Sequence, residues 1–192
     1  MPSGQGRTLE QALAYYCAPS MVGIKSADLF SWPQMEGAEL DAYVTALQAR
    51  GITLRVMRRG GKRMLLLVYR RRCLERRLAC PAVRGMLREA GYPEEGGVEA
   101  LLDVLSTRLS GGAFPHEIGL FLGYPPEDVE GFCRCKGQNY KLCGRWKVYG
   151  DQEAARRYFQ RCDRCRDRLC SRLEHQALAE LFPRVRRQEK GA

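Results

Sequence analysis

Apolar residues recur every three or four positions along most of the chain, which is the spacing of a helix with one buried face. This spacing predicts helices over residues 7–17, 38–49, 71–80, 81–90, 97–109, 115–122 and 126–135. Thr8 suits the N-cap of the first helix, which is expected to end before Pro19. A longer and strongly basic helix is predicted over about residues 151–181.

One segment follows a period of two and predicts a β-hairpin. Apolar and polar residues alternate from Ile52 to Val56, Gly60-Gly61 supplies the turn, and Met64 to Tyr69 forms a more buried return strand. Residues 140–149 predict a further strand, whereas residues 18–33 predict a loop with at most a short strand. The expected fold class is therefore α+β: helix-rich, with a small antiparallel sheet (hairpin 52–69 plus a strand near 140–149) and a long basic C-terminal helix.

The length of 192 residues fits one domain over residues 1–182, which could divide into an α+β lobe (1–92) and a mainly helical lobe (93–182). The tail 183–192 is expected to be disordered. The longest apolar run is MLLLV, which is too short to span a bilayer, and the N-terminus has no apolar signal segment. We therefore expect a cytoplasmic protein without membrane insertion. Nine cysteines are then reduced thiols, metal ligands or small buried hydrophobes.

Charge is segregated along the chain. The net charge of +10 divides into −3 over residues 1–49, +11 over 50–90, −7 over 91–132 and +9 over 133–192. The long helix carries a basic surface of Arg156, Arg157, Arg161, Arg164, Arg168 and Arg172. This surface could bind nucleic acid or an acidic partner, or it could pair with the acidic segment within the molecule. We prefer intramolecular pairing for part of the charge.

Residues 114–132, FPHEIGLFLGYPPEDVEGF, have the outline of a helix-turn-helix. Two apolar stripes face each other across the turn: Ile118, Phe121 and Leu122 in the first helix, and Val129, Phe132 and Cys133 in the second. In a DNA reader the second helix enters the major groove, but here it begins with Glu127, Asp128 and Glu130. An ordinary helical hairpin is preferred, and nucleic acid is a possible but not a favoured partner of the protein.

The cysteines suggest two uses. Cys162 and Cys165 have the spacing of half a zinc or iron-sulfur site, and Cys133, Cys135 and Cys143 form an irregular second half. The alternative is packing, which we prefer. It is supported by one helical stripe that holds the first two thiols: Tyr158, Cys162, Cys165, Leu169 and Leu173.

The segment NYKLCGRWKVYG has the most suggestive chemistry. As a strand it would turn Tyr140, Leu142, Trp146 and Val148 inward and Lys141, Cys143, Arg145 and Lys147 outward. Cations beside Cys143 would make its thiol more reactive and a better ligand, although an idle thiol on a solvated strand is the simpler interpretation. Gly144 permits close approach by a ligand or another segment. His116 and Glu117 could supply a ligand or a general base, or simply begin a helix.

Three stretches resemble an uncharacterised domain-of-unknown-function family of anaerobic Firmicutes, the DUF 3793 family: CAPSMVGIKSADLF, FPHEIGLFLGYPPEDVEGF and KGQNYKLCGRWKVYGD. The resemblance covers nearly the whole chain and implies one family domain without an established activity. It also suggests redox or metal metabolism near flavodoxin-like and iron-handling proteins. The matching positions are Cys17, Pro19, Lys25, Pro115, His116, Glu117, Gly123, Tyr124, Asn139, Tyr140, Lys141, Cys143, Trp146 and Tyr149. Cys133 and Cys135 stand where relatives are expected to carry other residues, which weakens a metal cluster built on them.

Our leading hypothesis is that Cys17, His116 and Cys143 bind a metal, haem or another redox-linked ligand, with iron, haem and zinc as the cofactors considered. Residues of the same motifs complete the candidate site: Glu117, Asn139, Tyr140, Lys141 and Trp146. The alternative is a non-catalytic interaction protein whose arginine surface docks nucleic acid or an acidic partner such as a flavodoxin-like protein. An enzyme with Cys143 as nucleophile is a third hypothesis, but the sequence contains no recognised catalytic signature that would name a reaction.

Overall fold

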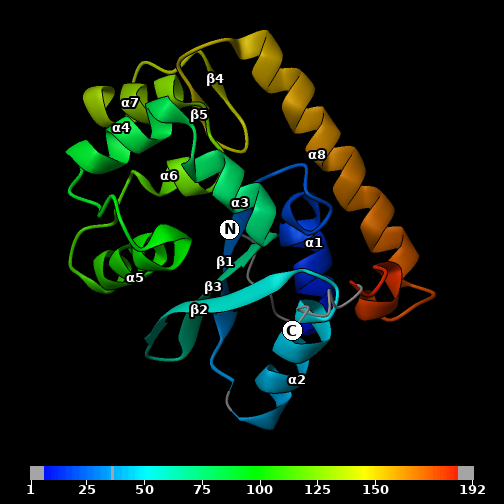
Figure 1. Cartoon of the computed structure of the whole chain (residues 1–192). Coiled ribbons are helices and arrows are strands. Elements are labelled where there is room, and N and C mark those ends of the chain that lie inside the picture. Colours follow the sequence, from blue (N-terminus) through cyan, green and yellow to red (C-terminus); the bar gives the residue numbers. More distant parts are fainter. Residues whose placement is uncertain (1–6, 36, 186–192) are drawn as a thin grey trace, which may run out of the picture.

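The computed structural model describes residues 7–35 and 37–185, which form helices around a three-stranded antiparallel sheet (Figure 1). The elements are α1 (Leu9–Met21), β1 (Ala27–Pro33), α2 (Ala38–Gln48), β2 (Thr53–Gly60), β3 (Arg63–Tyr69), α3 (Arg71–Leu78), α4 (Pro81–Glu89), α5 (Gly97–Ser110), α6 (Ile118–Phe121), α7 (Pro126–Cys135), β4 (Leu142–Cys143), β5 (Lys147–Val148), α8 (Gln152–Leu173) and a final 3₁₀ helix (Leu178–Leu181). The predicted α+β class, with a small sheet and a long C-terminal helix, is confirmed.

The sheet contains a strand that the hydrophobic pattern did not specify. Its order is β1-β3-β2, and all seven residues of β1 pair with β3, from Ala27 opposite Tyr69 to Pro33 opposite Arg63. Residues 140–149 do not join this sheet. They form a separate two-strand hairpin, β4–β5, because the backbone reverses at Gly144, whose N–H donates to the carbonyl of Trp146 at 3.0 Å.

Two helix ends also differ from the sequence prediction. Thr8 caps α1 as expected, since its side chain accepts from the Gln11 N–H, but the helix continues through Pro19 to Met21. The last five residues of α1 are buried, so packing outweighs the local effect of proline. At the other end of the chain, α8 stops at Leu173, and the 3₁₀ helix occupies part of the remaining predicted span.

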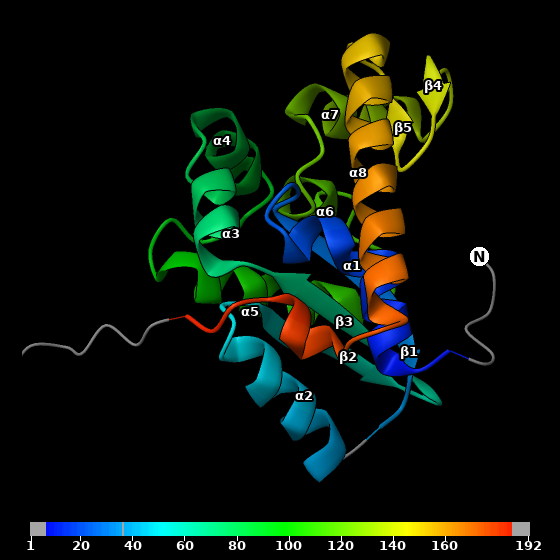
Figure 2. The ribbon, with the colours of Figure 1, turned by 90° about the vertical axis from the view of Figure 1, so that its right-hand side faces the viewer.

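β3 is the central strand and is buried on both faces, which explains its continuous apolar run. Met64, Leu66 and Val68 face one core, which α1, α2, α8 and the 3₁₀ helix cover. Leu65, Leu67 and Tyr69 face a second core, built with α3 to α7. In Figure 1, α1 and α8 lie to the right of the sheet and α4 and α5 to its left; Figure 2 shows α8 upright in front of α1. The core is therefore divided by the faces of the sheet.

The acidic and basic segments pair differently from our expectation. Arg55 contacts Glu99 at 2.6 Å and Asp103 at 2.5 Å, and Arg71 contacts Glu99 at 3.1 Å. The acidic segment thus neutralises part of residues 50–90. Within the described residues, no arginine of α8 forms an ion pair with residues 91–132; the ion pairs of this helix use its own carboxylates.

The end of the chain is tied to the fold as far as it is described. The Val185 N–H, within the span 183–192 that the sequence predicts to be disordered, donates to the carbonyl of Ala49 at 3.0 Å. Residues 186–192 lie outside the described part of the structure. No helix among the described residues is both long and apolar enough to cross a membrane.

Candidate functional site

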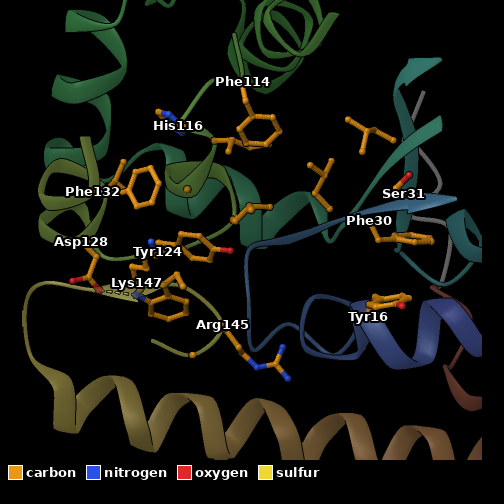
Figure 3. Close-up of a pocket in the computed structure, with 18 of the residues that line it drawn as sticks. Tyr16, Phe30, Ser31, Phe114, His116, Tyr124, Asp128, Phe132, Arg145 and Lys147 are labelled. Carbon is orange, nitrogen blue, oxygen red and sulfur yellow. Dashed lines mark hydrogen bonds between the residues drawn. The ribbon is translucent and has the colours of Figure 1, made fainter. Parts of the chain in front are cut away.

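A cavity of about 750 Å³ lies between β1, the α6–α7 helix pair and the β4–β5 hairpin (Figure 3). Most of its walls are apolar or aromatic. Seven aromatic residues contribute to them: Tyr16, Phe30, Trp32, Phe114, Tyr124, Phe132 and Trp146. The polar side chains in the lining are Ser31, Arg63, His116, Asp128, Cys143, Arg145 and Lys147. A cavity of this size and composition is typical of sites for small organic ligands.

Asp128 fixes one wall of the cavity. It lies in the first turn of α7 and is buried, and its carboxylate accepts three hydrogen bonds. The donors are the Trp146 indole Nε1 at 2.7 Å, the Tyr149 backbone N at 2.6 Å and the Gly150 backbone N at 2.8 Å. Asp128 therefore holds the β4–β5 hairpin against α7. Its carboxylate does not face outward, where a DNA-reading helix would meet the phosphates.

The loop before β1 is anchored by a buried ion pair. Lys25 Nζ lies 2.5 Å from Asp28 Oδ1, and the Ser20 backbone N–H donates to Asp28 Oδ2 at 3.2 Å. Burial alone would lower the pKa of Lys25, but the Asp28 carboxylate outweighs it and the pKa is raised. Two further bonds fasten the loop, from Ser26 Oγ to the carbonyl of Phe121 at 2.7 Å and from the Tyr158 hydroxyl to the carbonyl of Ile24 at 3.2 Å.

Close packing positions the aromatic side chains at the floor of the cavity. The rings of Tyr124 and Trp146 stack with centroids 4.6 Å apart, and Phe159 of α8 meets Trp146 edge-on at 4.6 Å. A Cβ at Gly144 would lie only 2.3 Å from the Phe159 ring. The close approach expected at Gly144 is therefore made by another segment of the chain.

The structure brings together two of the three principal candidates. His116 and Cys143 line the same cavity, whereas Cys17 does not. Cys17 is fully buried in the core on the α1 face, where burial and the nearby Asp28 carboxylate raise the pKa of its thiol well above the usual value. Within residues 7–35 and 37–185, no group of three or more His, Cys, Asp or Glu side chains is placed to hold a metal ion.

His116 and Cys143 have different surroundings. The His116 ring centroid lies 4.9 Å from that of Phe132 and 6.3 Å from that of Phe114, so the imidazole sits among aromatic rings (Figure 3). Cys143 is exposed on β4 and pairs in register with Lys147 on β5. Lys147, which the sequence predicts on the same strand face as Cys143, is thus its partner on the neighbouring strand.

The remaining motif residues have mainly structural contacts. Glu117 accepts from Arg108 Nη1 at 2.7 Å and from the Tyr92 hydroxyl at 3.1 Å, and the Lys141 ammonium donates to the carbonyl of Gly150 at 3.0 Å. Asn139 adopts a left-handed conformation with φ 57°. Tyr140 was predicted to face inward but is 43% exposed, because the backbone before β4 is irregular and not a strand.

The cysteine stripe on α8 packs as expected. Cys162 is buried, and Cys165 and Leu173 pack against the core beside buried Leu169. The prediction that Cys133 belongs to the apolar stripe facing α6 is wrong, because this residue is exposed on α7. The first helix of that pair is also a single turn, α6, and is shorter than predicted.

Sequence reasoning missed the wall contributed by α1 and β1. Tyr16 and Phe30 stack with centroids 5.9 Å apart, and Phe30 meets Trp32 at 6.3 Å. The alternation of Phe30, Ser31 and Trp32 was a weak strand signal that could have indicated this wall. Arg145 was also missed as a binding residue. Its Nη2 contacts Asp163 at 2.9 Å, while its buried Nε has no hydrogen-bond partner.

Comparison with known proteins identifies a family and no function. No curated protein and no solved structure matches the chain significantly. Residues 13–182 match a family described as "Protein of unknown function (DUF3793)". The match includes every element from most of α1 to the 3₁₀ helix, and with it all the residues that line the cavity. The chain therefore belongs to the DUF3793 family.

Proposed function

We propose that the protein binds a flat aromatic anion, of the haem kind, in the cavity between β1, α6–α7 and β4–β5. The observation that carries this proposal is the combination of aromatic walls, two potential iron ligands and three cations around one cavity. The proposal keeps His116 and Cys143 of the sequence hypothesis as ligand-binding residues. It assigns Cys17 a packing role in the core. We place this function in the cytoplasm, which the free state of all nine cysteines supports.

The aromatic walls favour a flat and largely apolar body. Tyr16 and Phe30 lie toward one end of the cavity, and Tyr124 and Phe132 toward the other (Figure 3). Trp32 adjoins Phe30, and Trp146 stacks on Tyr124. Aromatic rings stack on other aromatic systems with a gain of about 0.5–1.5 kcal/mol beyond the burial of area. A planar ligand would use both groups of rings, whereas a small hydrated ion would gain nothing from them.

The charges of the lining favour an anion. Arg63, Arg145 and Lys147 carry positive charge, and among the described residues Asp128 is the only carboxylate of the lining. The Asp128 oxygens are already occupied by three donors. A carboxylate or phosphate of the ligand would meet cations and could accept from the unpartnered Nε of Arg145.

Haem is the member of this ligand class that would also use His116 and Cys143. Haem iron in proteins is held by imidazole nitrogen or by cysteine thiolate, and its propionates are anions. A bare zinc or iron ion is less well served, because the described residues place no third protein ligand beside these two.

The test is a titration of the purified protein with haemin, in which the shift of the Soret absorption band measures binding. We expect stoichiometric binding, and we expect H116A to weaken it at least about tenfold, the loss of a contact worth about 1.4 kcal/mol. H175A is the matched control, because His175 is exposed beyond the end of α8 and does not line the cavity. C143S is compared in the same way with C133S, whose thiol is exposed on α7.

Metal-free protoporphyrin and a flavin mononucleotide separate the two parts of the proposal. Equal binding of protoporphyrin and haemin, unaffected by H116A and C143S, would retain the flat-anion site and remove the iron ligands. Absence of saturable binding of all three compounds, in protein that retains its secondary structure, would overturn the proposed function.

A further inference from the structure

The outward face of α8 carries an unbroken row of arginines. At 100° per residue, Arg157, Arg161, Arg164, Arg168 and Arg172 fall within an arc of about 80° around the helix axis. From residue 157 to residue 172, every position in this arc is arginine. We call these five residues the arginine row. It extends for about 22 Å, since a helix rises about 1.5 Å per residue.

The row is exposed and is not neutralised within the described protein. All five side chains belong to exposed residues. The acidic residues within α8, Glu153, Asp163 and Asp167, lie outside the arc and contact other cations, namely Arg145, Arg156 and Arg166. Across the described ranges 7–35 and 37–185, none of the five arginines takes part in an ion pair. The opposite side of α8 packs on α1, so the row faces away from the molecule (Figure 2).

The chemistry of the row favours phosphate over protein carboxylates. Stable protein–protein interfaces need an apolar centre, usually with aromatic anchors. None of the large apolar side chains that are exposed in the described structure lies on α8. A partner would therefore be recognised by charge alone, as the backbone of a nucleic acid is. Every cation of the row is arginine, whose planar fork binds phosphate with two parallel hydrogen bonds.

The same observations favour a duplex over a single strand. Proteins that bind single strands stack the open bases on exposed aromatic side chains. The aromatic residues of α8, Tyr158 and Phe159, are instead half-buried against Trp146. We infer that the arginine row binds the phosphate backbone of duplex nucleic acid without reading its sequence. This surface lies on α8 and is independent of the cavity proposed above.

The experiment measures anisotropy of a labelled mixed-sequence DNA duplex over a series of salt concentrations. Five phosphate contacts predict a slope of log K against log salt of about −4.5, at about −0.9 for each contact. The variant R161Q/R164Q/R168Q should bind at least about tenfold more weakly at low salt, and its slope should fall to about −1.8. Glutamine is a good helix former, so α8 is expected to persist, which circular dichroism will check.

A matched variant removes the same charge elsewhere. The variant K62Q/R72Q/R76Q replaces three exposed cations outside α8: Lys62 in the turn before β3, and Arg72 and Arg76 on α3. Its affinity for the duplex should fall by less than about threefold. If the two variants lose duplex affinity equally, the effect comes from net charge alone, and the assignment of the site to the arginine row is overturned. Binding of a polyglutamate of equal charge, of anionic lipid vesicles or of a single strand as tightly as the duplex would also overturn it.

Discussion

At the scale of single residues, the motif positions serve mainly to bring chain segments close together. Gly144 touches Phe159 so closely that no side chain fits, and Gly131 does the same for Tyr149, where a Cβ would lie 2.5 Å from the ring. These glycines are not in the left-handed region, so their role is contact distance and not backbone conformation. A resemblance between motifs therefore does not by itself identify binding residues.

Gly144→Ala should lower the free energy of unfolding by about 1–3 kcal/mol, because the methyl group forces Phe159 or the β4–β5 turn to move. Gly85→Ala is the control, since a Cβ there meets nothing within 4 Å and Gly85 lies inside α4. That change should raise the stability by about 0.5–1 kcal/mol. Urea unfolding measures both. An unchanged midpoint for Gly144→Ala would contradict the close contact.

At the scale of elements, the β4–β5 hairpin depends on its neighbours. Two strands of two residues each are too short to be stable alone. The hairpin is held by Asp128 on one side and by the aromatic contacts of Trp146 with α8 on the other. The element that carries Cys143 is thus positioned by residues that are distant from it in the sequence.

Asp128→Ala should destabilise the protein by about 2–4 kcal/mol, because three buried or half-buried donors lose their acceptor together. It should also weaken haemin binding, since Lys147 and Trp146 belong to the wall that Asp128 fixes. Asp128→Asn keeps one oxygen acceptor and should cost less. Denaturant unfolding with tryptophan emission as the probe compares the two variants. Equal losses would show that the acceptor bonds do not hold the hairpin.

At the scale of the whole molecule, several buried groups share one dependence on pH. The pKa of Lys25 is raised in the fold, and burial raises the pKa of Tyr92 and of Tyr158 strongly. A group whose pKa is higher in the folded state stabilises the fold below its unfolded pKa and loses that contribution as the pH rises. The unfolded values are about 10 for tyrosine and about 10.4 for lysine.

The free energy of unfolding should therefore fall as the pH rises above about 9.5, by about 1.4 kcal/mol for each pH unit and each tyrosine that is ionised only in the unfolded state. Tyr158→Phe removes one such hydroxyl. It should cost about 1 kcal/mol near neutral pH, through the lost bond to Ile24, and should make the alkaline decline shallower. Urea titrations between pH 7 and 10.5 test this, and parallel curves for the two proteins would disprove it.

Most of the secondary structure follows from local pattern. The periods near 3.6 and 2 located the helices and the hairpin, because amphipathic spacing and turn residues act within a few positions. The local pattern did not specify β1, because buried Asp28 interrupts its apolar face. That carboxylate is tolerated because Lys25 and the Ser20 N–H both contact it. α8 ends at Leu173, before the end near residue 181 that the pattern predicts.

The candidate site was only partly accessible from the sequence. By itself the sequence determined the helix-rich α+β class, the basic surface of the long helix and the choice of His116 and Cys143 as candidate ligands, since composition and spacing are local properties. Only the tertiary structure decided that these two residues share a cavity, that Cys17 does not, and that Tyr16 and Arg145 do. The physical reason is that a cavity arises where segments far apart in the chain pack incompletely, and no local pattern records which segments meet.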